Sequence, residues 1–266
     1  MPADPANVSP NPESPPPELL PSQPPVLPPA PRDIWTLRDL LSFLGFIPFA
    51  LLVSKLVVLM GYLALRPLTG WNAKVEGVQS DTMFLLVQQC VFYVLILGFI
   101  FLLARLQHQQ GFWKSLGWKK LSARQVLGYL AGGGGLAITI SVVLWLFPDA
   151  HGFPLEKLFS TRATTIAIGA FAISVAPVVE ELVFRGLLFA IVEGMAGLRF
   201  AVLSTAILFA GLHVPEYWHA WNHLLMILVV GIVFSLVRGI SGSLAASTIL
   251  HVGYNSFIML GVFVST

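Results

Sequence analysis

The sequence predicts an all-α fold, a polytopic bundle of transmembrane helices. Hydrophobic residues make up 56% of the 266 residues and charged residues only 11%, a mixture far from that of a soluble globular domain. The apolar residues also gather in stretches of about 20 residues, the length of helix that crosses the hydrocarbon core of a bilayer. We therefore expect an integral membrane protein.

About seven apolar stretches qualify as membrane spans, with a range of six to eight. They lie near residues 40–65, 83–106, 126–147, 164–194, 199–214, 223–238 and 243–264. Two of them, 199–214 and 223–238, are short for a straight crossing, so we expect them to be tilted or partly re-entrant. The glycine run 132–135 lies inside the third stretch, and this position favours close packing of helices.

Residues 1–33 form a separate, proline-rich segment that holds thirteen of the chain's 19 prolines. Proline removes a backbone donor and interrupts helices, and the segment has too few large apolar residues to form a core. It is predicted to be a disordered tail. The remaining chain divides into N-terminal transmembrane helices over 34–162 and a core over 163–264, which carries the polar motifs.

Basic residues indicate the orientation in the membrane. The connection between the second and third stretches carries five of them: Arg105, Lys114, Lys119, Lys120 and Arg124. By the positive-inside rule the 105–125 connection is cytoplasmic, which places the N-terminal tail in the cytoplasm as well. The net charge of +2 is too small and too scattered for a nucleic-acid partner, and we expect none.

Two carboxylates and a guanidinium lie near the middle of the fourth stretch: Glu180, Glu181 and Arg185. Three central charges cost on the order of 8–10 kcal/mol to insert, so ionisable residues at this depth mark a functional site. Glu181 and Arg185 stand at i and i+4 on one helix face and are predicted to pair. Glu180 points about 100° away. It has no local cation and is the candidate general base or acid.

Two later stretches carry polar side chains with the same spacing. Phe209 and His213 share one helix face, and His251 and Asn255 share another. An acid and a histidine can activate a water molecule, while a second histidine and an amide can donate to the oxyanion that forms on an attacked peptide bond. The competing interpretation is that these groups only hydrogen-bond helices together, as in a non-enzymatic immunity or scaffolding protein.

The ordered set of motifs, Glu180-Glu181-x-x-x-Arg185, Phe209-x-x-x-His213 and His251-x-x-x-Asn255, resembles the CPBP family of intramembrane proteases. That family includes CAAX prenyl endopeptidases and Abi-like bacterial relatives linked to bacteriocin processing and self-immunity. The resemblance covers roughly residues 163–264.

The resemblance implies a catalytic core of helices around a cavity in the membrane. Glu180 and His213 would activate the water, and His251 and Asn255 would stabilise the oxyanion. The residues implied to support the site are Glu181, Arg185 and Phe209. No cofactor is needed in this mechanism, although two histidines and a glutamate leave a zinc ion open.

The implied substrate is a membrane-associated protein or peptide. The implied location is the inner membrane of a prokaryotic cell.

Overall fold

The computed structural model describes residues 34–69, 81–148 and 161–265, and within these ranges the regular structure is entirely helical. The predicted all-α class is confirmed. The proline-rich segment 1–33 lies outside the described residues, so its predicted disorder stays a prediction.

The N-terminal half is formed by long apolar helices. Helix α1 spans Leu37–Thr69 and helix α3 spans Thr82–Leu102, where Asp81 caps the first turn by accepting from the backbone of Met83 and Phe84. A π-helical turn, η1 (Leu103–Gln107), ends α3 and leads into the short α4 (Phe112–Ser115). Helix α5 (Ala123–Leu146) then begins at a capping box formed by Ser122 and Gln125.

The acidic motif lies in one long span, Arg162–Ala196, made of three successive pieces. These pieces are α6 (Arg162–Glu181), the π-helical turn η3 (Leu182–Leu188) and α7 (Phe189–Ala196). The wider turn begins directly after Glu181 and contains Arg185. Turns of this kind inside α-helices are rare and are found frequently at functional sites.

The last three helices are α8 (Leu198–Leu212), α9 (Trp221–Ser241) and α10 (Leu244–Ser265). Six helices in the described residues are long and apolar enough to cross a membrane, and α8 is a shorter apolar helix. With 15 residues, α8 is about 22 Å long. Helix α9 begins two residues before and ends three residues after the predicted stretch 223–238, and Arg238 near its end is buried inside the protein.

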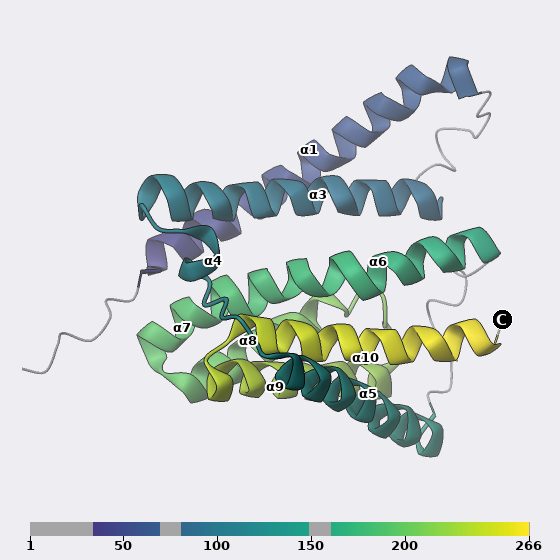
Figure 1. Ribbon diagram of the computed structural model, residues 1–266. Coiled ribbons are helices and arrows are strands. Elements are labelled where there is room, and N and C mark those ends of the chain that lie inside the picture. The colour runs from purple at the N-terminus through teal and green to yellow at the C-terminus, as the bar shows by residue number, and fades with distance from the viewer. Residues whose placement is uncertain (1–33, 70–80, 149–160, 266) are drawn as a thin grey trace, which may run out of the picture. The chain divides into compact units, whose positions relative to one another are not determined.

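Helix α3 packs against both α1 and α6, and α10 packs against α5, α6 and α9 (Figure 1). The largest cluster of buried apolar side chains joins these layers. It includes Phe43 of α1, Ile100 of α3 and Leu187 of η3. Leu116, which follows α4, is fully buried in the same cluster.

The connection that follows α4 is held tightly against the helices. Trp35 Nε1 donates to the Ser115 carbonyl at 2.7 Å, and the backbone N–H of Leu244 donates to the Gly117 carbonyl at 3.0 Å. Gly117 has a φ of +76°, and a side chain there would meet the guanidinium of Arg238. This basic connection therefore lies beside the end of α9 and the start of α10.

Helices α5 and α10 approach each other through glycines. A Cβ at Gly133 would overlap the carbonyl oxygen of Leu250, and a Cβ at Gly253 would overlap the carbonyl oxygen of Leu130. The predicted close packing at the glycine run 132–135 is confirmed at Gly133. Because Gly253 lies two residues after His251, this contact also positions the helix that carries the histidine motif.

We expect Gly253→Ala to destabilise the protein by about 1–3 kcal/mol, because the added methyl group overlaps the backbone of α5. Thermal unfolding in detergent measures the effect. Gly261→Ala is the matched control in the same helix, since a Cβ there meets nothing within 4 Å. That control should be neutral or slightly stabilising. Equal melting temperatures for the two variants would contradict the glycine contact.

Candidate active site

A fully buried ion pair forms the base of the site. Arg185 Nη1 donates to Glu181 Oε1 at 2.9 Å, and neither side chain is exposed. This is the i,i+4 pair predicted from the spacing. The other carboxylate oxygen, Glu181 Oε2, has no hydrogen-bond partner within the described part of the chain.

The guanidinium of Arg185 joins η3 to α9. Its Nη2 donates to the Gly231 carbonyl at 2.9 Å, and its Nε donates to Ser235 Oγ at 3.3 Å. Thr205 of α8 lies 3.0 Å from the same Ser235 hydroxyl. The guanidinium also lies over the ring of Phe209, 4.6 Å from the ring centre. One cation therefore holds together parts of η3, α8 and α9.

His251 connects α10 to both carboxylates. Its Nδ1 lies 3.2 Å from Glu181 Oε1, and its Nε2 lies 3.8 Å from Glu180 Oε2. The first distance is a hydrogen bond and the second is an ion-pair contact without one. Its ring packs against Phe234 at 4.5 Å between ring centres. Sequence spacing did not predict that His251 would stand between the two acids.

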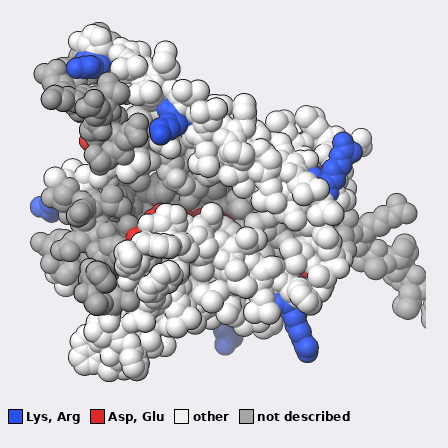
Figure 2. Space-filling model, turned by 180° about the vertical axis from the view of Figure 1, so that it is seen from behind, with Lys and Arg blue, Asp and Glu red and all other residues white. Residues whose placement is uncertain are grey.

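Glu180 differs from its neighbour in its access to solvent. Its side chain is 21% exposed, whereas that of Glu181 is fully buried. Figure 2 shows acidic side chains inside a hollow of the surface, while the basic side chains lie around the periphery. The Tyr93 hydroxyl of α3 donates to Glu180 Oε1 at 3.2 Å. The Glu180 carboxylate is thus held in place by a hydrogen bond and is still accessible to solvent.

His213 lies directly after α8 and is oriented by its own helix. Its Nδ1 lies 2.8 Å from the carbonyl oxygen of Phe209. Because a carbonyl only accepts, Nδ1 carries the proton and Nε2 of the neutral ring keeps its lone pair. The Phe209 ring lies 4.9 Å from the His213 ring and 6.0 Å from the His251 ring, measured between centres. Phe209 therefore lies between the two histidines.

Asn255 is oriented by α6. Its Nδ2 donates to the carbonyl of Ala172 at 2.8 Å. A primary amide has two N–H donors, so this bond uses one of them. The asparagine thereby links α10 to the middle of α6, about two turns before Glu180.

A third carboxylate, Glu216, was not among the predicted site residues. It lies in the turn after His213, and its backbone N–H donates to the His213 carbonyl at 3.2 Å. Desolvation by the surrounding protein raises the pKa of Glu216 above its ordinary value, His213 acts to lower it, and the charge of Glu180 raises it further. Glu216, His213 and Glu180 are therefore electrostatic neighbours. The motif spacing did not predict Glu216, because its electrostatic interaction with Glu180 joins segments that are far apart in the chain.

Residues 162–257 match the family model of Rce1-like type II CAAX prenyl endopeptidases. Over this segment the chain is similar to the CAAX protease family. It contains the acid pair, both histidines and Asn255, and it excludes Tyr93. No match to the chain is found among the curated proteins or the solved structures. The chain therefore carries an intramembrane endopeptidase domain of the CAAX type within an integral membrane protein.

The side chains of this CAAX-type domain do not form a metal site. In ranges 34–69, 81–148 and 161–265, no group of three or more His, Cys, Asp and Glu side chains is placed to hold a metal ion. Zinc ligands lie about 2.0–2.3 Å from the ion and must therefore converge. The set of two histidines and one glutamate left open by the sequence does not fit this requirement.

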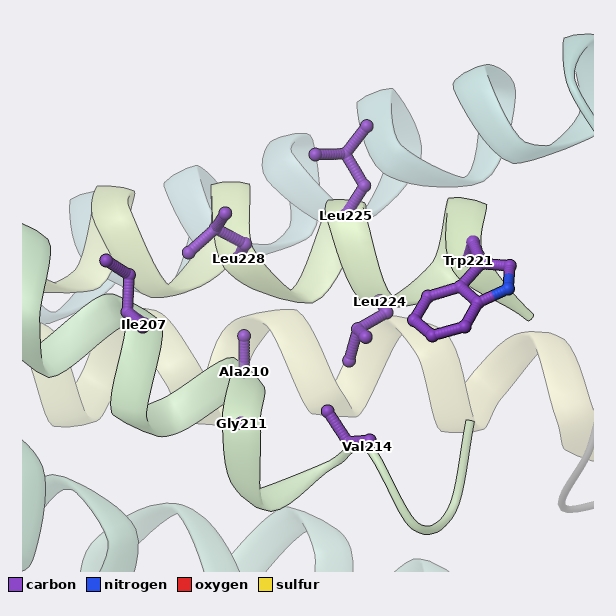
Figure 3. Close-up of a pocket in the computed structure, with 8 residues that line it drawn as sticks. All are labelled: Ile207, Ala210, Gly211, Val214, Trp221, Leu224, Leu225 and Leu228. Atoms are coloured by element: carbon purple, nitrogen blue, oxygen red, sulfur yellow. The ribbon is translucent and has the colours of Figure 1, made fainter. Parts of the chain in front are cut away.

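An apolar groove of about 280 Å³ lies beside the site, between α8 and α9 (Figure 3). Its lining residues are Ile207, Ala210, Gly211, Val214, Trp221, Leu224, Leu225 and Leu228. Gly211 and Val214 flank His213 in the chain, but none of the motif residues lines the groove. The acid pair and the groove are therefore separate features of the domain.

We expect Arg185→Met to destabilise the protein by about 3–5 kcal/mol, because it leaves the Glu181 carboxylate buried without its cation. Denaturation in detergent micelles measures the loss. Arg199→Met is the matched control, since Arg199 is exposed on α8. The double variant Glu181→Leu with Arg185→Met should recover part of the stability. A loss below about 1 kcal/mol for Arg185→Met would contradict a stabilising role of the pair.

Proposed function

We propose that the protein is an intramembrane endopeptidase that hydrolyses a peptide bond of a membrane-associated protein or peptide, with Glu180 as the general base. The observation that carries this proposal is the contrast between the two acids. Glu181 is neutralised and buried, while Glu180 is partly exposed near the middle of the span Arg162–Ala196. A free carboxylate at this depth is costly, and such groups mark functional sites.

In the proposed first step, Glu180 removes a proton from a water molecule as that water attacks the carbonyl carbon of the substrate. His213 assists by accepting a hydrogen bond from the same water at Nε2, since its Nδ1 is held by the Phe209 carbonyl. Positioned acid–base groups of this kind typically contribute 10²- to 10⁴-fold to the rate.

In the proposed second step, the tetrahedral oxyanion is stabilised by donors from α10. The doubly protonated His251 ring donates from Nδ1 to Glu181 and from Nε2 to the oxyanion, and Asn255 donates its second amide N–H. The proton taken up by Glu180 then passes to the leaving amine, and the C–N bond breaks. In this proposed mechanism the water is activated without a metal ion.

The function proposed here predicts that Glu180→Gln lowers cleavage by at least a hundredfold, because the amide cannot accept the proton of the water. New N-termini in the membrane proteome are compared between cells that express the wild-type chain and cells that express Glu180→Gln. Glu193→Gln is the matched control, since Glu193 is a half-buried carboxylate of α7 outside the motifs.

His213→Asn should give an intermediate loss in the same measurement. The non-enzymatic alternative, an immunity or scaffolding protein, predicts no difference in N-termini between the wild-type and Glu180→Gln chains. That outcome, with a correctly folded variant, would overturn the proposal.

We also propose that the N-terminus and the basic connection around α4 face the cytoplasm of a prokaryotic cell. Lys119 lies next to Gly242, between α9 and α10, and Arg199 lies at the start of α8. The basic residues thus gather at the end of the bundle where these helices turn. The positive-inside rule places such an end in the cytoplasm.

Cysteine labelling in spheroplasts tests this orientation. Cys90 is the single cysteine, so Cys90→Ser gives a chain without thiols. In that background Lys120→Cys should react with a membrane-impermeant maleimide only after permeabilisation, whereas Thr161→Cys should react in intact spheroplasts. The reverse pattern would show that the basic end faces outward.

A further inference from the structure

Tyr93 makes a specific polar contact with the proposed base from outside the family segment. Its hydroxyl donates to Glu180 Oε1 at 3.2 Å. Its ring stacks on Phe171 of α6, with 5.8 Å between ring centres and 16° between ring planes. Tyr93 belongs to α3, which precedes the matched residues 162–257.

The two oxygens of Glu180 therefore have different surroundings. Oε1 accepts from Tyr93, while Oε2 lies 3.8 Å from His251 Nε2, too far for a hydrogen bond. A glutamate side chain has several rotatable bonds and loses considerable conformational entropy when it is ordered. A base that takes a proton from water must nevertheless hold its oxygen within about half an ångström of the productive position.

The ring contact explains why Tyr93 can supply that restraint. Stacking on Phe171 fixes the direction of the phenol, and Phe171 lies on the same helix as Glu180. The hydroxyl is thus aimed at the carboxylate by a neighbour that moves with it.

We infer that Tyr93 is a positioning residue for Glu180, which holds Oε1 so that Oε2 receives the proton of the attacking water. This inference rests on the proposed function. The Tyr93 hydroxyl keeps its own proton throughout and only donates a hydrogen bond. The proton of the water moves to Oε2 and later to the leaving amine, as in the proposed reaction.

The test measures the rate at which Glu180-dependent new N-termini accumulate in membranes, a readout that does not require the substrate to be known in advance. Tyr93→Phe should lower this rate at least tenfold, because it removes only the hydroxyl. Tyr129→Phe is the matched control. Tyr129 is a half-buried tyrosine of α5 that packs against the cluster around Phe234.

A rescue separates positioning from a purely structural role. Replacement of Tyr93 by p-aminophenylalanine retains the ring and restores an N–H donor at the position of the hydroxyl. We expect this variant to recover most of the rate lost in Tyr93→Phe, with all three chains correctly folded. A rate for Tyr93→Phe within twofold of wild type, or no recovery with the amino analogue, would overturn the inference.

A double-mutant cycle on thermal stability provides a second measurement. Tyr93→Phe should change the melting temperature less in the Glu180→Ala background than in the wild-type background, because the acceptor is then absent. If the changes in melting temperature caused by Tyr93→Phe and Glu180→Ala are additive, the contact between Tyr93 and Glu180 is contradicted.

The outcomes also separate this inference from the proposed function. If Glu180→Gln retains every new N-terminus, the proposed function fails. If it abolishes them while Tyr93→Phe does not lower their rate, only the inference about Tyr93 fails.

Discussion

The buried pair of Glu181 and Arg185 is the interaction on which the rest of the site depends. Neither charge is exposed, and either one alone would carry a large desolvation penalty in an apolar layer. Together they neutralise each other and still have hydrogen-bonding capacity for other helices. Arg185 uses it for Gly231 and Ser235 of α9, and Glu181 uses it for His251 of α10. The pair thereby links the acidic helix to both α9 and α10.

The site is assembled from parts that are remote in the chain. Glu180 comes from α6, His213 from the end of α8, and His251 and Asn255 from α10, while Tyr93 comes from α3. Each of these side chains has at least one hydrogen bond or ion-pair contact to another element or to its own helix backbone. Such restraints matter in a membrane, because the bilayer core holds no water that could hydrogen-bond polar side chains instead.

The parts of this arrangement that follow from local spacing were predictable from the sequence. The pair Glu181–Arg185 depends only on the helical i,i+4 distance, and the spans depend on length and apolarity. The place of His251 between two carboxylates depends on how α10 packs against α6, which no local pattern encodes.

Tyr93 was missed for a similar reason. The apolar stretch that contains Tyr93 has no charged residue close to the tyrosine. A single tyrosine in an apolar helix also produces no periodic pattern that would indicate a functional role. The burial of Arg238 near the end of α9 was also missed, because its partners lie on other elements. Arg238 Nε donates to the Arg185 carbonyl at 3.0 Å and lies over the Phe189 ring.

The shortness of α8 has a consequence for the surrounding lipid. At about 22 Å the helix is shorter than the roughly 30 Å hydrocarbon layer, so its end cannot reach the far headgroups in a bilayer of ordinary thickness. Short segments are accommodated by thinning of the bilayer around them. The turn from His213 to Ala220 would then meet headgroups and water instead of acyl chains. A lipid defect at this edge would hydrate His213 and Glu216 without a channel through the protein.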